Sequence, residues 1–119
     1  MVDRLPRLLL HAEGAAVAAA AVTLYVHEGF DWWLLLVLGL APDLAMLGYL
    51  AGARAGAVAY DLVHTYVLPV LLAAAGVIWA SDAALAVALI WLTHIGVDRA
   101  VGYGLKYPGG FRDTHLQRV

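Results

Sequence analysis

Residues 83–105 read AALAVALIWLTHIGVDRAVGYGL, an apolar stretch whose basic and acidic side chains are His94, Asp98 and Arg99. Roughly 20 helical residues cross the ~30 Å hydrocarbon core of a membrane, so this stretch is long enough to span one. An ionisable side chain inside hydrocarbon is unfavourable unless it faces a protein or water interior and has a partner. The stretch therefore predicts a membrane helix with a polar face that meets other parts of the protein.

The rest of the chain has the same apolar character. Its 119 residues are 64% hydrophobic and 13% charged, whereas a soluble domain carries about 25% charged residues. A soluble helical bundle would need polar outer faces, which these segments lack. Short connections force neighbouring helices to run antiparallel. We predict an all-α fold in which residues 1–119 form a single four-helix transmembrane bundle with up-down-up-down topology. The predicted helices lie near residues 8–26, 32–51, 57–79 and 83–105.

The basic residues predict how the bundle is oriented. All seven fall before the first predicted helix, between the second and third, or at or after the end of the fourth. They are Arg4, Arg7, Arg54, Arg99, Lys106, Arg112 and Arg118. The positive-inside rule then places both termini in the cytoplasm. We expect a multi-pass protein of the inner (plasma) membrane.

Six ionisable side chains interrupt the apolar segments. They are Glu13, Asp43, Asp61, His64, His94 and Asp98. A helix rises about 1.5 Å per residue, which places all six roughly 6–17 Å from the cytoplasmic helix ends. Spacings of three residues (61 and 64) and four residues (94 and 98) put each pair on one helix face. The six residues are therefore predicted to meet in one layer in the cytoplasmic half of the membrane.

This set of side chains has the composition of a metal site. Two predicted helices supply one acid each, and the other two supply an acid and a histidine each. Dinuclear carboxylate sites in four-helix bundles take their ligands from the four helices in the same numbers. Asp43, His64, His94 and Asp98 are the predicted ligands. Oxygen and imidazole donors without sulfur suit one or two divalent ions of zinc, iron or manganese. The predicted catalytic residues are Glu13, Asp61 and Arg99, with the two acids as further ligands or a general base.

Two prolines fall close to predicted ligands. Pro42 directly precedes Asp43 inside the second helix, and Pro69 follows His64 by five residues in the third. Proline cannot donate a backbone hydrogen bond and kinks or breaks a helix. We expect a break beside Asp43 and a bend after His64.

Several functions are compatible with such a site. A metal could activate water for hydrolysis, which we favour slightly, or iron could oxidise a lipid-like or small-molecule substrate. The alternatives are a proton- or ion-coupled carrier or channel subunit, and a non-catalytic assembly protein whose polar network fixes helix packing. Membrane lipid is the expected partner, a homo-oligomer is possible in each case, and nucleic acid is not expected. The chain has no cysteine, so thiol nucleophiles are excluded. Its one serine, Ser81, lies in a predicted loop, which argues against a serine hydrolase.

Three runs of sequence carry a resemblance to a known family. They are LAPDLAMLGY at residues 40–49, DLVHTYVLP at 61–69 and HIGVDRAVGYGLKYP at 94–108. Together with Glu13-Gly14 and Thr114-His115-Leu116, they resemble a small bacterial membrane family catalogued as domain of unknown function 4260. That resemblance implies a four-helix membrane protein and no particular activity.

A weaker similarity is to the membrane-bound metal-dependent hydrolases. Those proteins combine a Pro-Asp motif with later histidine-containing helices, and Pro42-Asp43, His64 and His94 correspond to them in kind. This chain lacks the histidine before Pro-Asp and the second aspartate after it. The similarity implies metal-dependent hydrolysis.

Overall fold

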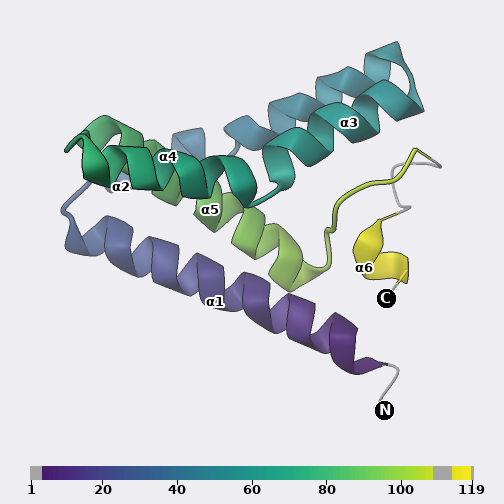
Figure 1. The fold of residues 1–119 in the computed structure, drawn as a ribbon, viewed down its shortest axis with the longest axis horizontal. Helices are drawn as coiled ribbons and strands as arrows, with labels where there is room; N and C mark the ends of the chain where they lie inside the picture. The colour runs from purple at the N-terminus through teal and green to yellow at the C-terminus, as the bar shows by residue number, and fades with distance from the viewer. Residues whose placement is uncertain (1–3, 109–113, 119) are drawn as a thin grey trace.

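The computed structural model describes residues 4–108 and 114–118, and these are almost wholly helical (Figure 1). The described residues contain no β-strand, only a single antiparallel bridge between Lys106 and Thr114. The all-α prediction is confirmed. The elements are α1 (Leu5–His27), α2 (Trp32–Leu38), the 3₁₀ helix η2 (Ala41–Ala51), α3 (Ala53–His64), α4 (Val67–Ile78), α5 (Asp82–Val101) and α6 (His115–Arg118).

Four helical spans in the described residues are long and apolar enough to cross a membrane. They are Leu5–His27, Trp32–Ala51, Ala53–Ile78 and Asp82–Val101. Large apolar side chains cover their outer surfaces, with Leu50, for example, 88% exposed. In water this much exposed apolar surface would be unfavourable, whereas lipid covers it at no such cost. The spans therefore have the surface of a membrane protein.

Helix α5 is the centre of the packing, with α1 running beside it (Figure 1). Helices α1 and α5 come close together at Gly14 and Gly96. A Cβ atom on Gly14 would lie 2.8 Å from the Gly96 carbonyl oxygen and would collide with the Arg99 Cβ atom. Small residues allow the backbones of membrane helices to approach this closely. Such close packing stabilises the pair, because lipid provides no hydrophobic driving force between helices.

The second span is broken at the predicted position. Helix α2 ends at Leu38, a turn follows at residues 39–40, and η2 begins at Ala41. Pro42 lies at the start of η2, where its missing N–H removes a helical hydrogen bond. Asp43 thus lies in the first turn after the break. The expected interruption beside Asp43 is confirmed.

The third span is also interrupted, more sharply than the predicted bend. Helix α3 ends at His64, Thr65 has extended backbone angles (φ −91°, ψ 149°), and α4 begins at Val67. Pro69 in the first turn of α4 cannot donate to the Thr65 carbonyl group, so a continuous helix would lack this bond. As a result α3 packs on η2, and this pair extends away from α1, α4 and α5 (Figure 1).

The fourth span ends earlier than the predicted residue 105. Helix α5 stops at Val101 because Gly102 adopts a left-handed conformation (φ 106°), the usual helix-ending role of glycine. The chain then passes alongside α3. The Lys106 N–H donates to Asp61 Oδ1, and the bridge to Thr114 brings the short α6 back, where Leu116 is 1% exposed.

Candidate metal centre

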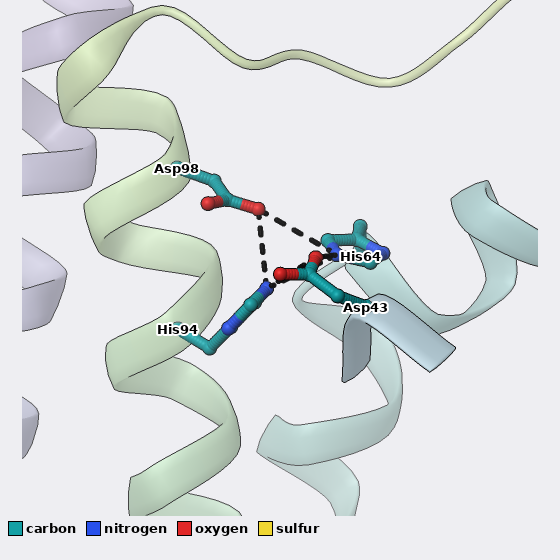
Figure 2. A group of neighbouring side chains, drawn as sticks. All are labelled: Asp43, His64, His94 and Asp98. Atoms are coloured by element: carbon teal, nitrogen blue, oxygen red, sulfur yellow. Dashed lines mark hydrogen bonds and ion pairs between the residues drawn. The ribbon is translucent and has the colours of Figure 1, made fainter. Parts of the chain in front are cut away.

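Four of the predicted site residues converge in the structure (Figure 2). Asp43 comes from the first turn of η2, His64 is the last residue of α3, and His94 and Asp98 lie one turn apart on α5. Each side chain offers one donor atom, and these four atoms all lie within 4.8 Å of one another. Three helical elements that are distant in sequence thus meet at one point.

The separations that involve a histidine nitrogen are close to those of a tetrahedral metal site. His94 Nε2 lies 3.1 Å from Asp43 Oδ1 and 3.2 Å from Asp98 Oδ2. His64 Nε2 lies 3.3 Å and 3.5 Å from the same two oxygens, and 3.2 Å from His94 Nε2. Donors ~2.0–2.1 Å from a tetrahedral zinc ion lie roughly 3.3–3.4 Å apart. The spacing therefore fits an ion of this kind at the centre of the group.

Backbone carbonyl groups fix the orientation of both histidine rings. His64 Nδ1 lies 2.9 Å from the Tyr60 carbonyl oxygen, and His94 Nδ1 bonds the Gly39 carbonyl oxygen at the end of α2. A carbonyl oxygen can only accept, so each Nδ1 must carry the hydrogen and donate it. The Nε2 atom of each neutral ring then has a free lone pair. Metal-binding histidines are typically held in this way by a partner on the other ring nitrogen.

With the ring hydrogens on Nδ1, all four atoms that face the centre are hydrogen-bond acceptors, and none of them carries a hydrogen. Each imidazole lone pair faces the other one at 3.2 Å and a carboxylate oxygen at 3.1–3.3 Å, which is close to van der Waals contact. Protonating both rings would point two N–H groups at each other across the 3.2 Å between the Nε2 atoms. One shared proton relieves only part of the repulsion, whereas a divalent cation attracts all four atoms at once.

The group is closed on the histidine side and open at Asp43. The side chains of His64 and His94 are 0% and 7% exposed, that of Asp98 is 16% exposed, and that of Asp43 is 45% exposed. A cavity of about 230 Å³ lies against Asp43 and Asp98 and is also lined by Tyr60. A small molecule can reach the donor atoms from this direction.

Tyr60 supports the site and was not predicted from the sequence. Its ring stacks on that of His64, with centroids 3.7 Å apart and an angle of 5° between the planes. Its hydroxyl group donates to Asp98 Oδ2 over 3.5 Å. The ammonium group of Lys106 lies 4.4 Å from the Tyr60 ring centre, and burial lowers the pKa of Lys106. The available signal was the four-residue spacing between Tyr60 and His64 on one helix.

Arg99, predicted to be catalytic, bonds backbone carbonyl groups. Its Nη2 donates to the His64 carbonyl oxygen at 2.6 Å and its Nη1 to that of Tyr103 at 2.9 Å. Trp91 Nε1 similarly donates to the Val63 carbonyl oxygen at 2.6 Å. The last carbonyl groups of a helix have no partner in the helix itself, and lipid offers none. Two side chains of α5 thus bond the last carbonyl groups of α3, at the predicted ligand His64.

The predicted catalytic acids lie outside the group of four ligands. Asp61 Oδ1 accepts a hydrogen bond from the Lys106 N–H, and its side chain lines a separate cavity beside His115. Glu13 is exposed on α1 and lines another cavity together with Tyr66 and Arg99. The structure therefore brings together the four predicted metal ligands and places Glu13, Asp61 and Arg99 around them.

Comparison with known proteins identifies a family for this chain. No curated protein and no solved structure matches it. The family model described as "Domain of unknown function (DUF4260)" matches residues 7–119, a range that includes every residue of the candidate centre. The chain therefore belongs to the DUF4260 family.

Proposed function

We propose that this protein is a membrane metalloenzyme that binds one zinc ion through Asp43, His64, His94 and Asp98 and uses it for hydrolysis. One observation carries the proposal. The Nε2 atoms of two histidines face each other at 3.2 Å while both rings donate from Nδ1 to backbone carbonyl groups. A pair of opposed lone pairs, flanked by two carboxylate oxygens, is stabilised best by a cation between them.

Zinc is favoured over manganese by the number and spacing of the donors. Four nitrogen and oxygen donors at tetrahedral separations are typical of zinc, whereas manganese favours six oxygen ligands. A single ion is favoured because the four donor atoms form one compact group, with Glu13 and Asp61 held elsewhere. A dinuclear centre would need further carboxylates to bridge the two ions.

Hydrolysis is the reaction that this arrangement favours. A zinc ion held by these four residues would have to expand to five ligands, as catalytic zinc sites can, in order to bind a water, and it would then lower the pKa of that water toward neutrality. Asp43 is the most exposed ligand, and its second oxygen, Oδ2, is the proposed base. It takes the proton of the water as the water oxygen attacks the carbonyl carbon of an ester or amide. The C–O or C–N bond then breaks, and the leaving group receives that proton.

We expect zinc and esterase activity to depend together on Asp43. Purified protein should contain about one zinc ion per chain, by analogy with other four-ligand sites. A chelator should remove both the ion and the turnover of a fluorogenic ester, and added zinc should restore them. Asp43→Asn should lower the turnover by at least about 100-fold, because general-base catalysis contributes roughly 10²–10⁴-fold. Elemental analysis and fluorescence measure the two quantities.

The matched control is Glu28→Gln, which removes a carboxylate from the exposed end of α1 far from the ligands in sequence. It should retain both zinc and turnover. Protein that binds no zinc, iron or manganese would contradict the whole proposal. Protein that binds zinc but hydrolyses no ester would limit the proposal to a metal-binding role.

A proton- or ion-coupled carrier is the second candidate. It is supported by the opening at Asp43, through which a proton can reach two histidines and Asp98. In that case the group would hold a shared proton in place of the metal. Metal-free protein whose proteoliposomes show proton flux, with the flux lost in Asp98→Asn, would favour the carrier.

We further propose that both termini lie in the cytoplasm of a cell whose inner membrane holds the protein. The basic residues near both termini and near residue 54 support this orientation. Because the chain has no cysteine, single cysteines can report it. Glu28→Cys should react with a membrane-impermeant maleimide in intact spheroplasts, and Gln117→Cys only in inverted vesicles. The reverse labelling pattern would overturn the orientation.

A further inference from the structure

An apolar cavity lies beside the candidate metal centre, on the side away from the polar opening. Its volume is about 360 Å³, and its lining is almost entirely apolar. Its lining includes Ala41, Pro42, Val63, Val87, Ile90 and Trp91. This volume is within the range of about 300–1,000 Å³ that small-molecule sites occupy.

The cavity adjoins the metal ligands through neighbouring residues of the chain. Pro42 directly precedes Asp43, and Val63 directly precedes His64. On α5, Ile90 and Trp91 lie about one turn before His94, whereas Asp98 in the polar cavity lies one turn after it. Along α5, His94 therefore lies between the residues that line the apolar cavity and Asp98, which lines the polar one.

An apolar cavity on one side of the donor atoms and a polar cavity on the other would suit an amphiphilic molecule. Empty apolar cavities stay dry and take up hydrocarbon in preference to water. A hydrocarbon chain in the apolar cavity would place the polar group attached to it at the four donor atoms. The leaving group and water would then occupy the polar cavity beside Asp43 and Tyr60. A volume of about 360 Å³ suits one short chain better than the two long chains of a phospholipid.

We propose that the substrate is an amphiphile with a single alkyl or acyl chain, held in this cavity with its hydrolysable carbonyl group at the metal. The inference rests on the proposed zinc site and adds the class of substrate. The apolar cavity is lined by the residues that directly precede Asp43 and His64, and the polar cavity by Asp43 and Asp98 themselves. The chain enters from the lipid, and water reaches the carbonyl group from the opposite side.

The test uses n-alkyl hydroxamates, whose head group binds zinc and whose chain length can be varied. Zinc-loaded protein in one detergent is titrated with acetohydroxamate and with longer members of the series. Burial of each methylene is worth up to about fourfold in affinity, so binding should strengthen with length and level off once the cavity is filled. Calorimetry or displacement of a fluorescent chelator measures the Kd.

Two variants assign the effect of chain length to the cavity. Val87→Phe adds a bulky side chain to the cavity wall, and Val97→Phe makes the same change elsewhere on α5. The two valines are similarly exposed, at 43% and 46%. Val87→Phe should weaken binding of the longer hydroxamates at least about tenfold while leaving acetohydroxamate unchanged. Val97→Phe should behave as the wild type. Ala41→Leu, which changes the same cavity from η2, serves if Val87→Phe does not fold.

The outcomes separate this inference from the proposed function. Failure of the protein to load zinc or to bind acetohydroxamate would overturn the metal site and the substrate class together. Acetohydroxamate binding with no gain from longer chains, or an equal gain in Val87→Phe, would overturn the substrate class alone. Equal binding of long hydroxamates to zinc-free protein would also overturn it, because the chain would then bind independently of the metal.

Discussion

Replacing His94 by alanine is expected to abolish metal binding. His94 Nε2 lies within 3.2 Å of donor atoms from the three other ligands, so it is the ligand with the closest contacts in the group. Loss of a supporting partner alone weakens metal binding roughly 10–100-fold, and loss of a direct ligand should exceed that. Zinc content after dialysis against a weak chelator should fall from about one ion per chain to less than about a tenth. Elemental analysis of the purified protein measures it.

His11→Ala is the matched control. His11 is also partly buried, and its Nδ1 also donates to a backbone carbonyl group, that of Ala100, at 2.9 Å. It differs from His94 in lying outside the group of four donors. We expect this variant to keep its zinc. Equal zinc contents in the two variants would show that the metal, if bound, lies elsewhere.

The largest effect on stability is expected for Gly14→Leu. Gly14 is buried against α5, where an added Cβ atom would lie 2.8 Å from both the Ala100 nitrogen and the Gly96 oxygen. These are backbone atoms and cannot turn aside, so α1 must move away from α5. Overpacking costs about 1–3 kcal/mol, and the loss of further helix contacts adds to it. The free energy of unfolding, measured by denaturation in mixed micelles, should fall by at least that amount.

The adjacent Ala15→Leu makes a similar change in volume at a position exposed on the outer surface of α1. In lipid or detergent this side chain meets hydrocarbon, so the free energy of unfolding should change little. If Gly14→Leu unfolds at the same denaturant concentration as Ala15→Leu, the close contact between α1 and α5 is not important for stability.

Much of this fold follows from local properties of the sequence. The apolar length of residues 83–105 was sufficient to predict a spanning helix, and the same argument holds for the other three spans. Similar depth in the membrane and shared helix faces were sufficient to bring Asp43 together with His64, His94 and Asp98. These residues are costly in lipid wherever they are not partnered, so their joint presence is itself informative.

Depth alone does not determine which side chains meet. Glu13 precedes Gly14, the contact residue of α1, and a rotation of about 100° per residue turns it away from α5. Asp61 and His64 point about 60° apart around the axis of α3, because three residues do not complete a turn. Asp61 accepts a hydrogen bond from the Lys106 N–H and so does not join His64 in the group of four. The sharp separation of α3 from α4, and the bonds of Arg99 to the end of α3, depend on packing between distant segments. No local pattern encodes these features.

The two interrupted spans give the proposed ion a mechanical role. Asp43, His64 and His94 are separated by 21 and 30 residues, so one ion bound to all three closes two loops of the chain at once. A disulfide stabilises proteins in the same manner, and this chain has no cysteine. The η2–α3 pair extends away from α5 (Figure 1), and it is joined to its neighbours at the two breaks and by the bonds of Arg99 and Trp91 to the end of α3. A bound zinc ion would thus act as a cross-link that holds the η2–α3 pair against α5.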